Sequence, residues 1–157
     1  MPGFEVDRLP PLPADQLDAR QRAAAQAIID GPRGALYGPF VPLIRSPELM
    51  DAAQRMGEYL RYRSAIGTRL SELAILVTAR QWDQQVEWAI HAPIAAREGI
   101  SQTAISAIAE RRQPSFERDD EGLVHAVSWQ LLQHKRVDDS TWAAACALLG
   151  EQGLVDL

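Results

Sequence analysis

The chain has 157 residues, of which 46% are hydrophobic and 24% are charged, as is usual for a globular domain with its own core. Its formal net charge is -5, so it lacks the overall basic character that is common in nucleic-acid-binding proteins. We therefore expect no nucleic-acid partner. The single cysteine, Cys146, excludes an internal disulfide framework.

Neither a membrane segment nor a secretory signal is evident in the sequence. No stretch approaches the roughly 18 consecutive apolar residues of a membrane-spanning helix. The first residues, MPGFEVDRLPPLPADQ, contain no basic region followed by an apolar core. We therefore expect a cytoplasmic protein that does not contact membranes.

The N-terminal third combines an extended arm, a helix and a long loop. Residues 1–13 contain four prolines and predict an extended arm, because proline fixes φ and removes a backbone donor. The remainder, 14–157, is expected to form a single domain. A helix is predicted from Ala14 to about Ile29, where DGPRG ends it. The next stretch, GPRGALYGPFVPLIRSP, predicts a packed loop, a candidate wall or lid of a pocket.

Apolar residues then recur at helical spacing in six further segments, and no segment shows the alternation of a strand. These predicted helices span residues 46–63, 69–80, 84–98, 102–112, 122–135 and 140–151. Thr68 and Ser101 are expected to cap the helices that they precede, and Gly99 is expected to end one. The expected fold is all-α, with about six to seven helices.

A short turn, QWDQ, joins two of these helices, so they should pack antiparallel. Residues equidistant from the turn then lie at one level, which places Glu72 beside His91. Glu87 lies one turn before His91 on the same helix face. This pattern brings together two carboxylates and one imidazole, a set that can exchange protons as acid–base catalysis requires. A purely structural ion pair is the alternative interpretation.

The stretch LRYRSAIGTRLSELAILVTARQWDQQVEWAIHAPIAAREGIS resembles the carboxymuconolactone decarboxylase family, which includes the alkyl hydroperoxidase D-like proteins. The resemblance covers about residues 34–157. It rests on the ELAIL helix, the Glu-x-x-x-His step and A-x-x-x-G after the histidine. It implies an alkyl hydroperoxidase D-like helical bundle with the site on a central helical hairpin. It also implies homo-oligomers, trimers or hexamers, with sites near subunit interfaces.

The resemblance also separates two branches of the family. Peroxidase-type members carry cysteines at the positions of Gln84 and Glu87, so this chain lacks the dithiol that reduces peroxides. Decarboxylase-type members have glutamate and histidine at Glu87 and His91, as here. The implied activity is decarboxylation, without a cofactor, of a small carboxylated lactone or aromatic ring-cleavage product. His91 would donate the proton, Glu72 would orient it, and Glu87 would share the proton network or position the substrate.

Two alternatives to a carboxy-lyase stay open. One is an alkyl hydroperoxidase or peroxiredoxin-like antioxidant protein, which family membership suggests and the missing cysteine pair disfavours. The other is a non-catalytic oligomeric binding protein that retains the fold. Cys146 lies in an alanine-rich segment and is expected to be small core filling.

Five further residues are candidates for substrate binding. Trp82 and Trp88 flank the motif, with core or interface packing as the alternative role. Arg80 and Arg97 are candidates for holding a substrate carboxylate, which a guanidinium group binds bidentately, with surface solvation as the alternative. Gln84 is the fifth.

Other polar residues receive no assigned role. Arg61 and Arg63 share the ambiguity between carboxylate binding and surface solvation. His125 and His134 lie nine residues apart, so they do not share one helix face, and we expect structural roles for both. The sequence shows no metal-ligand spacing, and we expect no metal.

Overall fold

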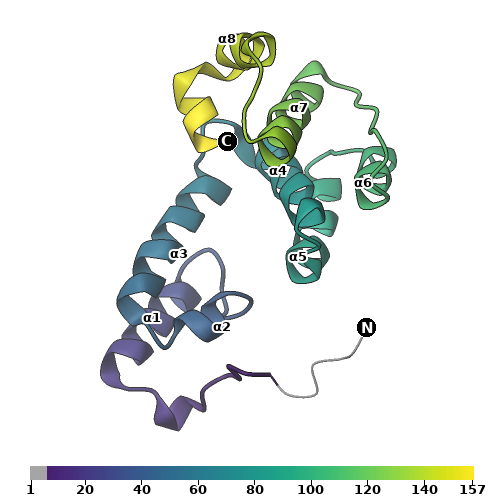
Figure 1. The fold of residues 1–157 in the computed structure, drawn as a ribbon. Helices are drawn as coiled ribbons and strands as arrows, with labels where there is room; N and C mark the ends of the chain where they lie inside the picture. The colour runs from purple at the N-terminus through teal and green to yellow at the C-terminus, as the bar shows by residue number, and fades with distance from the viewer. Residues whose placement is uncertain (1–6) are drawn as a thin grey trace. The chain divides into compact units, whose positions relative to one another are not determined.

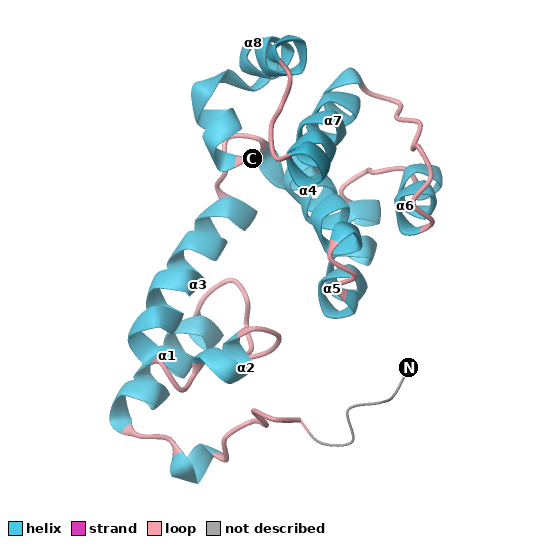
Figure 2. Cartoon of the chain, viewed as in Figure 1, coloured by secondary structure: helices cyan, strands magenta, loops and turns pink. Residues whose placement is uncertain are grey.

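The structure is a computed structural model that describes residues 7–157 (Figure 1). Over this range it contains helices and no strand, which confirms the predicted all-α class (Figure 2). A 3₁₀ helix, Ala14–Gln16, precedes eight α-helices. These are α1 (Ala19–Asp30), α2 (Phe40–Leu43), α3 (Pro47–Tyr62), α4 (Gly67–Gln81), α5 (Gln85–Arg97), α6 (Gln102–Ala109), α7 (Asp119–His134) and α8 (Asp139–Asp156).

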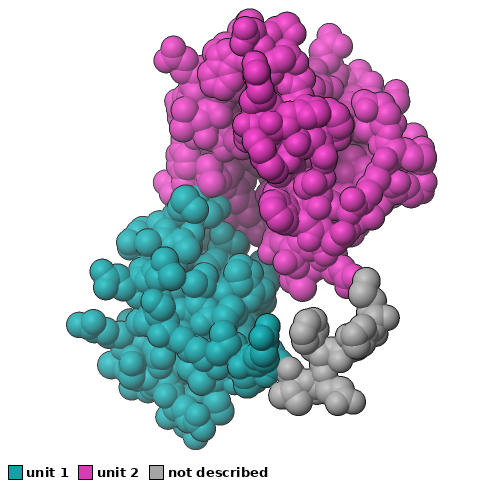
Figure 3. Space-filling model, viewed as in Figure 1, with its two compact units in different colours: residues 1–58 teal, residues 59–157 magenta. Residues whose placement is uncertain are grey.

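The chain divides into two compact units, residues 1–58 and 59–157, which Figure 3 shows in different colours. The division falls within α3 and does not coincide with the boundary predicted after residue 13. The arm predicted at 1–13 lies partly outside the described residues, and its described part, 7–13, contains no helix or strand.

Unit 1 begins its first long helix later than the sequence predicts. The side chain of Asp18 accepts a hydrogen bond from the backbone N–H of Gln21, and the side chain of Gln21 accepts one from the backbone of Asp18. This reciprocal capping box starts α1 at Ala19. The helix predicted from Ala14 is therefore two elements, a 3₁₀ turn and α1.

The stretch predicted as a loop between α1 and α3 contains the four-residue helix α2, the one α-helix that sequence patterns missed. Phe40 is 5% exposed and Ile44 is 2% exposed. Together with residues of α1 and α3 they form the core of unit 1, which comprises Ala24, Ala25, Ile28, Phe40, Ile44 and Met50. The stretch is packed, as predicted, and its apolar side chains stabilise this unit.

Helix α4 is the central element of unit 2 and packs against α5, α6 and α7. Leu73 and Leu76 on α4 are fully buried. The core of this unit comprises Leu70, Leu73, Leu76, Val77, Ala95, Ile100, Ala104, Ile105, Ile108 and Val124. These apolar residues surround α4 on several sides. A polar side chain that points from α4 into this core is out of reach of water and needs a hydrogen-bonding partner within the protein.

The ends of the unit 2 helices confirm two predicted signals and correct one. The Ser101 side chain accepts a hydrogen bond from the N–H of Ala104 at 3.2 Å, and Gly99 has φ +99° after α5. Thr68 does not cap α4: the helix begins at Gly67, whose φ is +73°, and the cap position is Ile66. Glycine takes this left-handed conformation easily, so the helix begins two residues earlier than predicted.

Charged contacts join the helices of unit 2. Arg69 on α4 pairs with Asp120 and Glu121 in the first turn of α7. Near the end of α8, Asp156 accepts hydrogen bonds from the hydroxyl of Tyr59 at 3.2 Å and from the N–H of Ala65 at 2.7 Å. These bonds attach the last helix to the segment that leads from α3 into α4.

Helix α8 contains a kink at Gly150, where φ is 69°. The predicted helix ends at Glu151, close to this kink, and the structure adds a further helical turn up to Asp156. Between residues 7 and 157, no helix has both the length and the apolar character needed to cross a membrane.

Candidate functional site

The predicted proximity of Glu72 and His91 is confirmed across the α4–α5 hairpin. Glu72 is 0% exposed, and its Oε2 lies 2.6 Å from Nδ1 of His91. His91 is 7% exposed. An ionised carboxylate has no proton to donate, so Nδ1 of His91 donates this hydrogen bond to Glu72. The bond fixes the ring, and Nε2 is left as the nitrogen that can exchange a proton with a substrate.

Glu87 faces the other nitrogen of the same ring. Its Oε2 lies 3.3 Å from Nε2 of His91, within ion-pair distance but without the alignment of a hydrogen bond. The Glu87 side chain is 36% exposed, whereas that of Glu72 is fully buried. The two carboxylates therefore differ in role: one holds the ring from inside, and the other connects it with solvent. We call Glu72, His91 and Glu87 the relay.

A third charged group reaches the relay from the end of α3. Nε of Arg61 lies 3.7 Å from Oε1 of Glu72, and the guanidinium group is 5.2 Å from the ring centre of Tyr62. Oε1 of Glu72 is buried and has no hydrogen bond. The carboxylate is thus balanced in charge by Arg61 but not fully hydrogen-bonded. Sequence patterns left Arg61 without a role, because it lies on a helix outside the hairpin.

Hydroxyl groups connect the end of α3 with α4 beside the relay. The hydroxyl of Ser71 donates to the carbonyl of Leu60 at 3.1 Å and lies 3.1 Å from that of Ser64. Leu60 and Ser71 are the chain neighbours of Arg61 and Glu72. These hydrogen bonds therefore fix the position of Arg61 relative to Glu72 along the two helices.

The other predicted binding residues lie in different settings. Trp88 packs partly buried against the core of unit 2. Trp82 ends α4 and is 69% exposed. Gln84 stands before the first residue of α5 and makes no side-chain capping bond. Arg97 is exposed in the last turn of α5 and makes no ion pair with another described residue.

Arg80 lies away from the relay, in a pocket of about 310 Å³ at the other end of α4. It is eight residues beyond Glu72, which is about 12 Å along the helix axis. None of the three relay residues lines this pocket. The loop after α6 and the middle of α7 supply its other walls, and no sequence signal connects them with α4.

The relay arrangement suits proton transfer. Glu72 and Glu87 contact different nitrogens of His91, so their oxygens do not converge on one point. Among residues 7–157, no set of three or more His, Cys, Asp or Glu side chains is placed to hold a metal ion. Cys146 is half-buried on α8, and the sequence contains no second thiol to pair with it. A histidine held by one carboxylate and reached by another can give and regain a proton.

Comparison with known proteins adds no relative: no protein-family model, no curated protein and no solved structure matches the chain.

Proposed function

We propose that the chain is a cofactor-free decarboxylase of the carboxymuconolactone decarboxylase type, with an alkyl hydroperoxidase D-like fold. Its substrate is a small carboxylated lactone or an aromatic ring-cleavage product. The observation that supports this most is the buried Glu72–His91 pair, whose free ring nitrogen faces Glu87. According to the sequence resemblance, members of the decarboxylase branch have glutamate at the position of Glu87 and histidine at that of His91.

The reaction needs charge stabilisation and one proton. The bond between the substrate carbon and its carboxylate breaks, CO₂ leaves, and the electron pair moves into the lactone as an enolate. That carbon then takes the proton that Nε2 of His91 carries, while the Nδ1–H of the ring stays hydrogen-bonded to Glu72. Glu87 is half exposed and returns a proton from solvent to Nε2. The chain contributes orientation and the proton, and the lactone carbonyl accepts the electrons.

A homo-oligomer would enclose this site. Trp82 is 69% exposed and Val86 is 53% exposed, and both lie within five residues of Glu87 in the sequence. Exposed large apolar side chains next to a reactive group suit a second copy of the chain, because contact would remove them from water. A trimer or hexamer is the assembly that we propose, and sedimentation analysis of the Trp82→Ser variant tests it. A monomeric wild-type chain would refute it.

The direct test measures CO₂ release from γ-carboxymuconolactone by the wild type and by His91→Gln. Glutamine retains a polar side chain beside Glu72, which limits damage to the fold, but it cannot deliver the proton. We expect kcat to fall by about 10²–10⁴-fold. His134→Gln is the matched control because His134 is exposed at the end of α7, and its rate should equal that of the wild type.

A second variant separates orientation from proton donation. Glu72→Gln leaves the imidazole in place but no longer selects the protonated Nδ1, and we expect kcat to fall by about 10²-fold with little change in KM. If the wild type releases CO₂ from γ-carboxymuconolactone only at the uncatalysed rate, this compound is excluded as the substrate. Equal rates for the wild type and His91→Gln would remove the relay from the mechanism.

The two other functions predict different results. A thiol-dependent peroxidase would lose peroxide reduction in Cys146→Ser, whereas we expect no such activity in either protein. A non-catalytic binding protein would assemble normally and turn over no candidate substrate. Turnover that depends on His91 would exclude both.

A further inference from the structure

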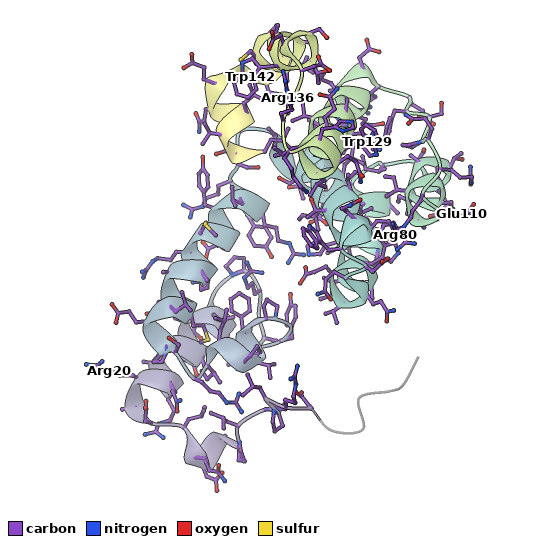
Figure 4. All side chains as sticks on the ribbon, viewed as in Figure 1. Arg20, Arg80, Glu110, Trp129, Arg136 and Trp142 are labelled. Atoms are coloured by element: carbon purple, nitrogen blue, oxygen red, sulfur yellow. The ribbon has the colours of Figure 1, made fainter. Side chains whose placement is uncertain are left out.

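The pocket at the C-terminal end of α4 is separate from the relay and has the features of a binding site. It lies between α4, the loop after α6 and the middle of α7, and its volume is about 310 Å³. This is at the lower end of the range for small-molecule sites, roughly 300–1,000 Å³. Figure 4 labels Arg80, Glu110 and Trp129, which lie on α4, at the end of α6 and on α7.

The pocket carries one surplus positive charge. Its lining includes three arginines, Arg80, Arg111 and Arg112. Asp83 pairs with Arg80 and Arg111, and Glu110 pairs with Arg112 through Nε at 2.7 Å. Three guanidinium groups against two carboxylates leave one positive charge over. A ligand with a single negative charge would balance it.

His125 also lines this pocket, and it lacks a polar partner. It is 9% exposed, and its ring centroid lies 5.4 Å from that of Phe116. Neither ring nitrogen makes a hydrogen bond with another residue in the described part of the chain. Burial lowers the pKa of His125, so the ring is neutral at pH 7 and offers one donor and one acceptor. The ring nitrogens are not among the fully buried atoms that lack a partner, so they are open to solvent in the pocket, and a ligand hydroxyl can replace water there.

The remaining lining is suited to a flat apolar body. Val77, Ile108 and Leu132 contribute aliphatic side chains from three different elements. Trp129 adds an indole that is 44% exposed. Aromatic rings pack well against an indole and aliphatic groups, and both surfaces gain from leaving water. Charge, the unpartnered histidine and the apolar lining together define the chemistry of the occupant.

We propose that this pocket binds a small aromatic carboxylate that carries a hydroxyl group on its ring. Arg112 offers the carboxylate its two terminal nitrogens, which make no hydrogen bond with another described residue, and the surplus charge of Arg80 and Arg111, which share Asp83, adds attraction in the same pocket. The ring packs against Trp129 and the aliphatic side chains. The hydroxyl completes the hydrogen bonding of His125. This site does not depend on the relay or on the proposed decarboxylase activity.

Calorimetric titration of the full chain with para-hydroxybenzoate tests the proposal. We expect saturable binding that weakens by about tenfold in Arg112→Gln, which removes one charge-assisted contact. Arg20→Gln is the matched control: Arg20 is exposed on α1 in unit 1 and does not line the pocket, so its affinity should equal that of the wild type. The neutral probe para-hydroxybenzamide should bind about tenfold more weakly than the acid.

Two further variants locate the ligand. His125→Phe fills similar space, and it should bind benzoate and para-hydroxybenzoate equally, whereas the wild type prefers the hydroxylated acid. His91→Gln should bind para-hydroxybenzoate as the wild type does. The proposal is overturned by the absence of saturable binding at millimolar ligand. It is equally overturned if the amide binds as tightly as the acid, or if His91→Gln loses affinity while Arg112→Gln keeps it.

Discussion

The two ends of α4 hold their charged groups in opposite ways. Near the start of the helix, Glu72 is 0% exposed and has a 2.6 Å hydrogen bond to one histidine. At the other end, Arg80 shares the exposed Asp83 with Arg111, and water reaches all three side chains. A buried charge needs a partner in a fixed position, whereas an exposed one is screened and can exchange partners. The first setting suits proton transfer, and the second suits reversible binding of an anion.

Replacement of His91, at the buried end of this contrast, should lower the free energy of unfolding more than any other change proposed below. In His91→Ala, Glu72 loses its hydrogen-bond partner in the core, and we expect the free energy of unfolding to fall by about 3–5 kcal/mol. The triple variant Arg61→Met/Glu72→Leu/His91→Leu should recover much of this loss, because apolar residues of similar size can replace a buried set of ion pairs, Arg61 included. Urea unfolding measures both values. A triple variant less stable than His91→Ala would show that the charged set itself stabilises the fold.

Replacement of an apolar residue between the two ends of α4 should cause the second-largest loss of stability. Leu76 is fully buried on α4 between Glu72 and Arg80, and Leu76→Ala should cost about 3 kcal/mol by creating a cavity. Thermal unfolding followed by circular dichroism measures the loss. Thr78 is exposed on the same helix, and Thr78→Ala is the control that should leave stability nearly unchanged. Equal effects of the two changes would contradict the placement of Leu76 in the core of unit 2.

Acid should affect the pocket end through His125. Burial lowers the pKa of this imidazole from its usual 6.5, so the unfolded chain binds the proton more readily than the folded one. Its contribution to stability is therefore complete above pH 6.5 and is lost as pH falls through the folded-state value.

The measurement is the free energy of unfolding as a function of pH for the wild type and for His125→Gln. We expect a shallower decline below pH 6.5 in the variant. His134→Gln should follow the wild type, because that histidine is exposed. Parallel curves for the wild type and His125→Gln would rule out a contribution from His125.

The exposed pair at the turn should give the smallest effect. The hydrogen bond from Arg111 holds the pKa of Asp83 below its usual 3.8, so the pair stabilises the fold above that pH and the contribution disappears as pH falls through the lowered value. At neutral pH, Asp83→Asn should change stability only slightly, because exposed ion pairs contribute little. Salt titration of the melting temperature measures this. A loss comparable with that of Leu76→Ala would contradict the contrast between the two ends.

Helical periodicity predicted the described fold class and seven of the eight α-helices. It missed α2, because four residues among glycines and prolines are too few to show a period. The hairpin argument placed Glu72 beside His91, since a short turn leaves two helices little freedom in register. It did not assign Arg61 or place Arg80 in a separate pocket, because both depend on contacts with helices outside the hairpin.

The sequence by itself determined what is local: which segments are helical, and that Glu87 and His91 share a helix face. The capping of α6 by Ser101 and the end of α5 at Gly99 belong to the same class, because neighbouring residues decide them. Only the tertiary structure decided that Glu72 is fully buried while Glu87 stays half exposed. It alone brought the arginines of the loop after α6 to His125 on α7. Burial and long-range contacts depend on how helices pack. The sequence of one helix shows its own apolar face but not which other helix covers that face.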